Sequence, residues 1–366
     1  MRMKKLMFFA VAAIALVACS KEFDTNKSAS NGTAIGFNTW AEHLTKATSN
    51  TITNAFASGD NFAVYGYKDK TTPAKATVFD DVVVSTEDGS AWTYSPARFW
   101  DTTYDSYTFF AVSPAAIGTG GTVDPQTGEI TSASITFAGD DNDILVADKK
   151  TVEKGSSPYF NNYATVPLVF NHVASLVDFK VKKASSLSSA TVTLSAFELS
   201  DIDNAGVLSV SDAYTSTHPV ASWSTAGRGT YGPGDGVTPV NISSPITIAE
   251  DTAFPGTPAA STMVINNLIV KPQTFRASDG SNPQKITLTY KIAVTGSADV
   301  EYANCVLYLC DFDNVDDEDQ GGDAPIASWE PGKHYTFFIT IDAHKISFSA
   351  SITPWADVNG YNYLLN

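Results

Sequence analysis

The sequence predicts an all-β protein made of two consecutive antiparallel β-sandwiches. Thr, Ser, Gly, Asn, Val and aromatic residues dominate the 366-residue chain, and strong helix formers are sparse after the first 20 residues. Short β-type runs recur with Gly, Pro, Asn and Asp between them, without the helices that a parallel α/β fold would need. Since 43% of the residues are hydrophobic and 11% aromatic, the chain can fill two cores.

The charge of the chain argues against one class of partner. Asp and Glu number 39 against 23 Lys and Arg, which gives a formal net charge of −16. Such a chain is repelled by phosphate backbones and by anionic lipid headgroups. We therefore do not expect a nucleic-acid partner.

Residues 1–18 are expected to be an export signal. A basic start is followed by an apolar run from Leu6 to Ala18, whose 13 residues would span about 20 Å as a helix, short of a ~30 Å hydrocarbon core. The run ends in Leu-Val-Ala-Cys, which resembles a bacterial lipobox, and this predicts that Cys19 is lipidated and becomes the mature N-terminus. The alternative is an ordinary signal peptide with a chance cysteine.

The N-terminal sandwich is expected to cover residues 34–163. Residues 19–33 are polar and would serve as a tether, because they cannot bury a core. The β-type runs of this domain are FAVYGY from Phe62, TVFDDVVV from Thr77, AWTYSPARFW from Ala91 and SYTFFAV from Ser106. The segment FNNYAT, residues 160–165, is the expected junction.

The C-terminal sandwich is expected to cover residues 164–366. Its runs include residues 165–183, 190–199, 262–272, 285–294, 334–341 and 345–353. The last run alternates most clearly: Ser and Thr residues separate the apolar residues Ile346, Phe348, Ala350 and Ile352. Pro354 ends regular pairing, and Trp355 begins an aromatic tail that should be held against something.

Cys305 and Cys310 lie in the run EYANCVLYLCDF. In one extended strand their spacing puts the side chains on opposite faces and the Cα atoms about 16 Å apart, too far for a disulfide. We expect both to be small buried hydrophobic residues rather than metal ligands.

No catalytic constellation stands out, so we expect neither an enzyme nor a cofactor. The five histidines fit no metal-binding spacing, and His172 is expected to be a hydrogen-bonded structural residue. The GxGxxG at 227–232 runs into Pro-Gly-Asp-Gly instead of a helix, which predicts a flexible loop. The acidic run at 311–323 lacks the EF-hand order and is expected to be a solvated loop rather than a calcium site. Trp223 and Tyr231 are aromatic residues that could stack on a sugar.

Several segments together resemble the fimbrillins, the type V pilus subunits of Bacteroidales. They are the lipobox at Cys19, TKAT at 45–48, FNHVASLVDFKV at 170–181, WEPGKHYTFFITI at 329–341 and the terminal strand that leads to Trp355. The resemblance covers nearly the whole chain. It implies two transthyretin-like sandwiches, export to the outer membrane as a lipidated precursor, and cell adhesion through a pilus built with other pilin subunits.

The resemblance also implies that an Arg- or Lys-specific surface protease cuts after the first strand. In this chain the cut would fall between Lys46 and Ala47; many relatives carry Arg where this chain has Lys46. The removable strand would place Ile35, Phe37, Trp40 and Leu44 inward, which requires a bulge or bend near Thr39 because of their parity. A plain surface turn at Lys46 is the alternative.

Removal of a strand would leave an open apolar groove that a strand from a neighbouring subunit can fill. Such a head-to-tail match does not close and gives a filament. The expected donor is the C-terminal strand, with Ile346, Phe348, Ala350, Ile352 and Trp355 as the inserted residues. Two alternatives stay open: the last strand is never exchanged, or the protein is a monomeric, surface-exposed lipoprotein that binds glycans.

Overall fold

The fold is that of a computed structural model, which describes residues 32–40, 56, 58–71, 74–137, 143–154, 160, 165–211, 218–231, 240–248, 262–314, 325–342 and 346–354. Within these ranges the chain is all-β, as the sequence predicts, and its only helical turns are the 3₁₀ turns η1 (Ser185–Leu187) and η2 (Leu309–Asp311). Over the same ranges, no helix has the length and apolar character needed to span a membrane.

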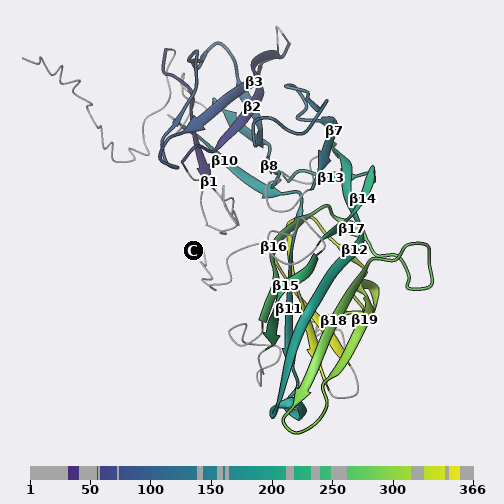
Figure 1. Ribbon diagram of the computed structural model, residues 1–366. Helices are drawn as coiled ribbons and strands as arrows, with labels where there is room; N and C mark the ends of the chain where they lie inside the picture. The colour runs from purple at the N-terminus through teal and green to yellow at the C-terminus, as the bar shows by residue number, and fades with distance from the viewer. Residues whose placement is uncertain are drawn as a thin grey trace, which may run out of the picture.

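The first sheet holds most of the N-terminal strands. They are β1 (Gly36–Trp40), β2 (Asn61–Asp69), β3 (Ala76–Thr86), β4 (Trp92–Thr93), β5 (Ser106–Ser113), β8 (Leu145–Ala147), β9 (Lys150–Glu153) and β10 (Thr165–His172). The order across the sheet is β1-β10-β8-β5-β2-β3-β4, and β9 also pairs with β5. Figure 1 shows this sheet, coloured from purple through blue to teal, at one end of the molecule.

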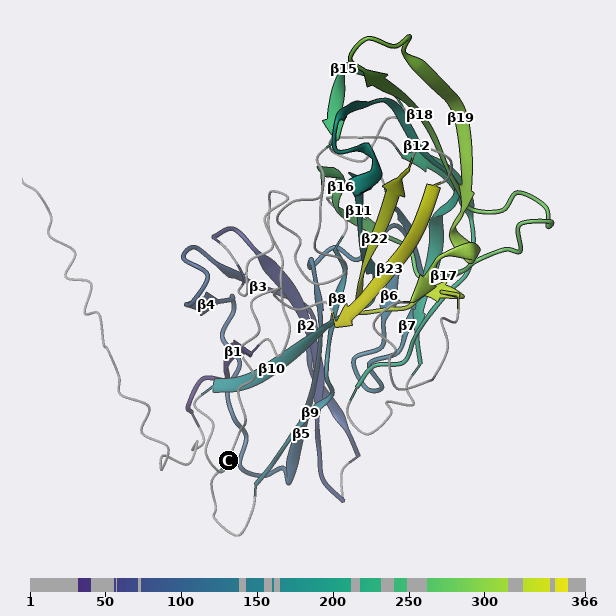
Figure 2. The ribbon, with the colours of Figure 1, turned by 90° about the horizontal axis from the view of Figure 1, so that it is seen from below.

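The second sheet lies in the C-terminal part of the chain. Its strands are β11 (Ser175–Lys183), β16 (Thr262–Val270), β20 (Asp313–Asn314), β22 (Lys333–Ile341) and β23 (Ile346–Pro354). Their order is β16-β11-β22-β23-β20, and Figure 2 shows β22 and β23 side by side in yellow.

The third sheet joins strands from both halves of the chain. It contains β6 (Thr122–Val123), β7 (Ile130–Thr136), β12 (Ala190–Val210), β13 (Ala221–Trp223), β14 (Gly227–Tyr231), β15 (Val240–Ile248), β18 (Lys285–Val294) and β19 (Val300–Tyr308). The order is β19-β18-β12-β7-β6, with β13, β14 and β15 also paired to β12. A separate pair is formed by β17 (Gln273–Thr274) and β21 (Ser328–Trp329).

The long strand β12 connects the two halves. Its residues Ala190–Ser200 pair with β18, and its residues Ala205–Val210 pair with β7. Three buried clusters accompany the sheets. One is filled by the second and third sheets, one by the first sheet, and one is shared by β2, β5 and β7 with β11, β12 and β16. The two halves therefore share both a sheet and a core.

Most predicted strands are confirmed, with two differences. The runs at Phe62, Thr77 and Ser106 form β2, β3 and β5. The run at Ala91 forms only the two residues of β4, because Pro96 has no N–H to donate to a ladder. The run at 165–183 divides into β10 and β11, which belong to different sheets.

The expected domain boundary at residue 163 stays a prediction, but strand pairing crosses it in both directions. β10 begins two residues later and pairs with β1 and β8 of the N-terminal half. Conversely, β7 pairs with β12 of the C-terminal half. Since β11 begins at Ser175, the first sheet extends to His172.

Candidate functional site

The first strand, β1, is bonded on both flanks. On one side it pairs in parallel with β10, with an unbroken register from Gly36 opposite Thr165 to Trp40 opposite Val169. On the other side the backbone N–H of Ile35 donates to the carbonyl of Arg98, and that of Trp100 donates to the carbonyl of Thr33. The register continues through Thr39 to Trp40 without a bulge, and the alternative bend that would turn Trp40 and Leu44 inward stays a prediction, because the described residues include neither the Trp40 side chain nor Leu44.

Two inward side chains, Phe37 of β1 and Ile35 directly before it, complete the core of the first sheet. Ile35 is 1% exposed and Phe37 is 4% exposed, whereas Gly36, Asn38 and Thr39 are half-buried. This is the two-residue alternation of a strand with one buried face. The ring of Phe37 lies 5.2 to 6.4 Å, centroid to centroid, from four aromatic rings, those of Phe62, Phe79, Tyr94 and Phe109.

Two side chains of the segment 92–100 also bond β1. The hydroxyl of Tyr94 donates to the carbonyl of Ile35, and the indole N–H of Trp92 donates to the Thr39 hydroxyl at 3.2 Å. Burial raises the pKa of Tyr94 above its ordinary value, which keeps the hydroxyl protonated as the donor. We call this segment, residues 92–100, the clamp. The sequence predicted a strand over the run from Ala91, whereas within this segment only the two residues of β4 form a regular strand.

The last strand, β23, lies in the second sheet. All nine of its residues pair antiparallel with β22, from Ile346 opposite Ile341 to Pro354 opposite Lys333. On its other side, the described residues include two pairs with β20, Asp313 opposite Ser349 and Asn314 opposite Ala350. Ile346 and Ile352 pack against the C-terminal core but are only partly buried. In this single chain the last strand therefore completes its own sheet.

Other predicted site residues lie outside the described residues. These are Cys19, Leu44, Lys46, Ala47 and Trp355. For Trp40, Phe348 and Ala350 the structure describes the strand position but not the side chain.

The residues considered for metal or nucleotide binding have structural roles instead. His172 is buried, and its Nδ1 lies 2.9 Å from Asp143, as expected of a hydrogen-bonded structural histidine. The GxGxxG is not a loop at its start, since residues 227–231 form β14 against β12. In the described part of the chain, no group of His, Cys, Asp and Glu side chains could hold a metal ion.

The two candidate aromatic residues for sugar stacking make internal contacts. Tyr231 is 2% exposed, and its hydroxyl donates to the carbonyl of Phe137. Trp223 packs on the ring of Phe137, and its indole N–H donates to the carbonyl of Val173. Tyr231 therefore presents no face to a glycan.

Both described cysteines are free thiols. Cys305 lies in β19 and Cys310 in η2. The two cysteines therefore do not share one extended strand, which differs from the sequence-based expectation. Each packs partly buried against the C-terminal core, and burial raises the pKa of both thiols.

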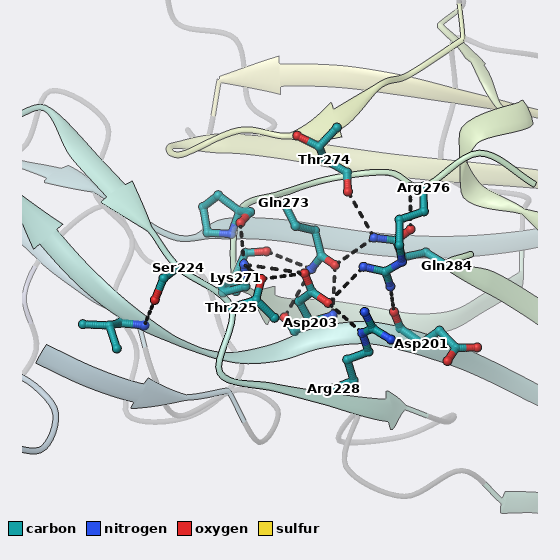
Figure 3. A network of polar contacts seen from close by, with 12 residues as sticks. Asp201, Asp203, Ser224, Thr225, Arg228, Lys271, Gln273, Thr274, Arg276 and Gln284 are labelled. Carbon is teal, nitrogen blue, oxygen red and sulfur yellow. Dashed lines mark hydrogen bonds and ion pairs between the residues drawn. The ribbon is translucent and has the colours of Figure 1, made fainter. Parts of the chain in front are cut away.

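One polar cluster was not predicted from the sequence. At the middle of β12 the buried carboxylate of Asp203 lies 3.1 Å from Arg276, 3.5 Å from Arg228 and 3.9 Å from the ammonium of Lys271 (Figure 3). Its backbone N–H donates to Gln273 at 2.9 Å. Burial lowers the pKa of Lys271, and the charge of Asp203 opposes that shift. The cluster joins β12, β14 and β17 where β12 passes from one half to the other.

The fold and site define an all-β protein in which the first and last strands complete two different sheets. Comparison with family models shows that the chain belongs to the Fimbrillin-like family, whose model matches residues 45–355. Members of this family are fimbrial and cell-adhesion proteins of the cell surface, with structural rather than catalytic roles.

One of two similar solved structures supports the fold at low sequence identity, that of the Bacteroides vulgatus protein. A fimbrial protein from Bacteroides vulgatus is 16% identical with a TM-score of 0.53, over 88% of this chain and 99% of that one. A fimbrilin from Porphyromonas gingivalis is 10% identical with a TM-score of 0.42, over 90% of this chain and 99% of that one. A search of curated proteins finds no match.

Proposed function

We propose that this chain is a structural pilus subunit with two transthyretin-like sandwiches, without enzymatic activity, whose first strand is a temporary filler. The precursor is exported, lipidated at Cys19 and anchored in the outer membrane. A surface protease then cuts between Lys46 and Ala47 and removes the strand. The groove receives a strand from another pilin subunit, and the resulting extracellular filament contributes to cell adhesion.

The observation that carries this proposal is the placement of β1. Five residues pair with β10, and the clamp bonds the strand on its other flank. Removal of the strand would leave the backbone groups of β10 and of Arg98 and Trp100 unpaired, beside the aromatic site of Phe37. Such a groove is an aggregation hazard unless another strand refills it. Strand addition restores both the hydrogen bonds and the burial.

The filament follows from the two strands lying in different sheets. β1 belongs to the first sheet and β23 to the second, so acceptor and donor are different surfaces of one chain. A contact between different surfaces is heterologous and continues from subunit to subunit.

The test is controlled cleavage of the purified precursor by trypsin. We expect a cut after Lys46 followed by ladders that resist SDS. The variant K46A should remain uncut at this position and monomeric, whereas K46R should still be cut and polymerise. A cut protein that stays monomeric and is retarded on glycan affinity gels would instead support the glycan-binding alternative.

A further inference from the structure

The described contacts of β1 and of the residues just before it all precede the proposed cut. They involve residues 33–40, and Lys46 lies six positions beyond Trp40. A cut after Lys46 therefore breaks none of these contacts. It removes only the covalent link that keeps the strand at a high effective concentration beside its groove.

The contacts that remain after such a cut are those of a core element. Ile35 is 1% exposed and Phe37 is 4% exposed, and the ring of Phe37 lies among four aromatic rings. The ladder to β10 and the backbone bonds to Arg98 and Trp100 hold both flanks of the strand. To leave, the strand must expose both apolar side chains to water and leave backbone groups unpaired. The cut strand is therefore held by the same contacts as the uncut one.

The chain on the other side of the cut is anchored in the same core. Phe56 is 6% exposed, and its ring lies 5.1 Å from that of Trp92 and 5.3 Å from that of Phe170, centroid to centroid. Its ring also lies 6.3 Å from that of Phe62, which in turn lies 6.4 Å from the ring of Phe37. The two chain ends that a cut creates are therefore attached to one cluster of rings, and the cut leaves that cluster intact.

We infer that the segment before the cut stays in its groove as a non-covalent ligand of the cut subunit and leaves only when another strand displaces it. This inference rests on the cleavage and strand exchange proposed above and adds the order of the steps: displacement, rather than the cut itself, removes the strand. The same segment carries Cys19. A cut subunit therefore remains attached to the lipid through β1 until it joins the polymer, and its apolar groove is never open to water.

Cleavage of the full-length precursor in dilute solution tests this inference. The variant K46R is cut with an Arg-specific protease, which spares Lys21 and Lys27 in the tether. The protease is then inhibited, and gel filtration at intervals separates polymers, monomers and free peptide. Denaturing mass spectrometry of each fraction locates the peptide that ends at residue 46, and the mass of the remaining subunit verifies a single cut.

Three variants in the K46R background relate peptide release to the contacts of β1. F37A empties the aromatic site and should release the peptide from the cut monomer about a hundredfold faster. T39V removes only the acceptor of the Trp92 indole, which leaves the core intact, and should release it about fivefold faster. N38A, at a half-buried position, is the matched control and should leave the release rate unchanged.

We expect one peptide per subunit in the monomer fraction after the cut, and an equal amount of free peptide for each subunit that enters a polymer. Free peptide that appears before any polymer would overturn this inference and leave strand exchange in place. Equal release rates in all three variants would overturn it as well. Absence of a cut at residue 46, or polymers that still hold one peptide per subunit, would instead overturn the proposed function.

Discussion

At the scale of single residues, the ring of Phe37 lies among four aromatic rings and is 4% exposed. The substitution F37A removes these contacts and leaves a cavity, so we expect the precursor to lose about 3–5 kcal/mol of unfolding free energy. Urea denaturation measures this loss. The neighbouring variant N38A, at a half-buried position, should change stability by less than about 0.5 kcal/mol. Equal effects of the two variants would contradict the inward placement of Phe37.

Buried tyrosines give a pH dependence at the same scale. Burial raises the pKa of Tyr107, Tyr335 and Tyr290 to about 12, and it also raises that of Tyr94. A tyrosine whose folded pKa is raised stays protonated in the folded state after the unfolded chain has ionised. Its contribution to stability is therefore complete below pH 10 and is lost as the pH rises from about 10 to about 12.

We expect the urea midpoint to fall over this pH window. The variant Y107F should show a smaller fall than the unsubstituted protein, because Tyr107 is fully buried. A midpoint that stays constant through this window would contradict the burial of these hydroxyls.

At the scale of elements, the clamp donates a hydrogen bond to a side chain of β1. The Trp92 indole donates to the Thr39 hydroxyl in the precursor. The variant T39V removes this acceptor, so we expect the precursor to lose about 1 kcal/mol of unfolding free energy, measured by urea denaturation.

The Trp92 variant is the matched control for this prediction. In W92F the T39V substitution should cause no such loss, because the donor is absent. An equal loss in both backgrounds would assign the effect to other contacts of Thr39 rather than to the clamp.

The alternation of apolar and polar residues along the sequence predicted which residues form strands, but it did not predict which strands pair with one another. The alternation of the last run became β23, and the runs at Phe62, Thr77 and Ser106 became β2, β3 and β5. The parallel pairing of β1 with β10 joins residues more than 120 positions apart, and no local pattern carries that information. The 21-residue β12 was predicted only up to Leu199, because its second half contains Asp, Asn and Gly.

The contacts of the clamp and the Asp203 cluster escaped prediction for a related reason. The sequence predicted a strand over the run from Ala91, but the segment bonds residues 33–39 through one hydroxyl, one indole and backbone groups, and such contacts leave no periodicity to detect. The cluster gathers residues from 203 to 276 that look like ordinary surface charges in the sequence. The inward positions of Ile35 and Phe37, by contrast, followed directly from two-residue alternation.

At the scale of the whole molecule, the strand β12 and the carboxylate of Asp203 connect the two halves of the chain. β12 pairs with β18 on one side of Asp203 in sequence and with β7 on the other. The carboxylate is 9% exposed and faces three cationic side chains in a chain of net charge −16. Without that anion, the 3% exposed ammonium of Lys271 would be buried beside two arginines with no counter-charge.

The variant D203N should therefore destabilise the protein by about 3 kcal/mol, and both halves should unfold in a single transition at lower urea. The matched control is D201N. Asp201 also lies on β12 and forms an ion pair with Lys285, but the side chain of Asp201 is 26% exposed and that of Lys285 is 33% exposed. Loss of this ion pair should therefore cost less than about 1 kcal/mol of unfolding free energy. Tryptophan fluorescence follows both halves, since Trp100 lies in the core of the first sheet and Trp329 in the C-terminal core. If D203N separated the unfolding into two transitions, the shared core of β2, β5 and β12 would not be enough to couple the halves, and Asp203 would be the link between them.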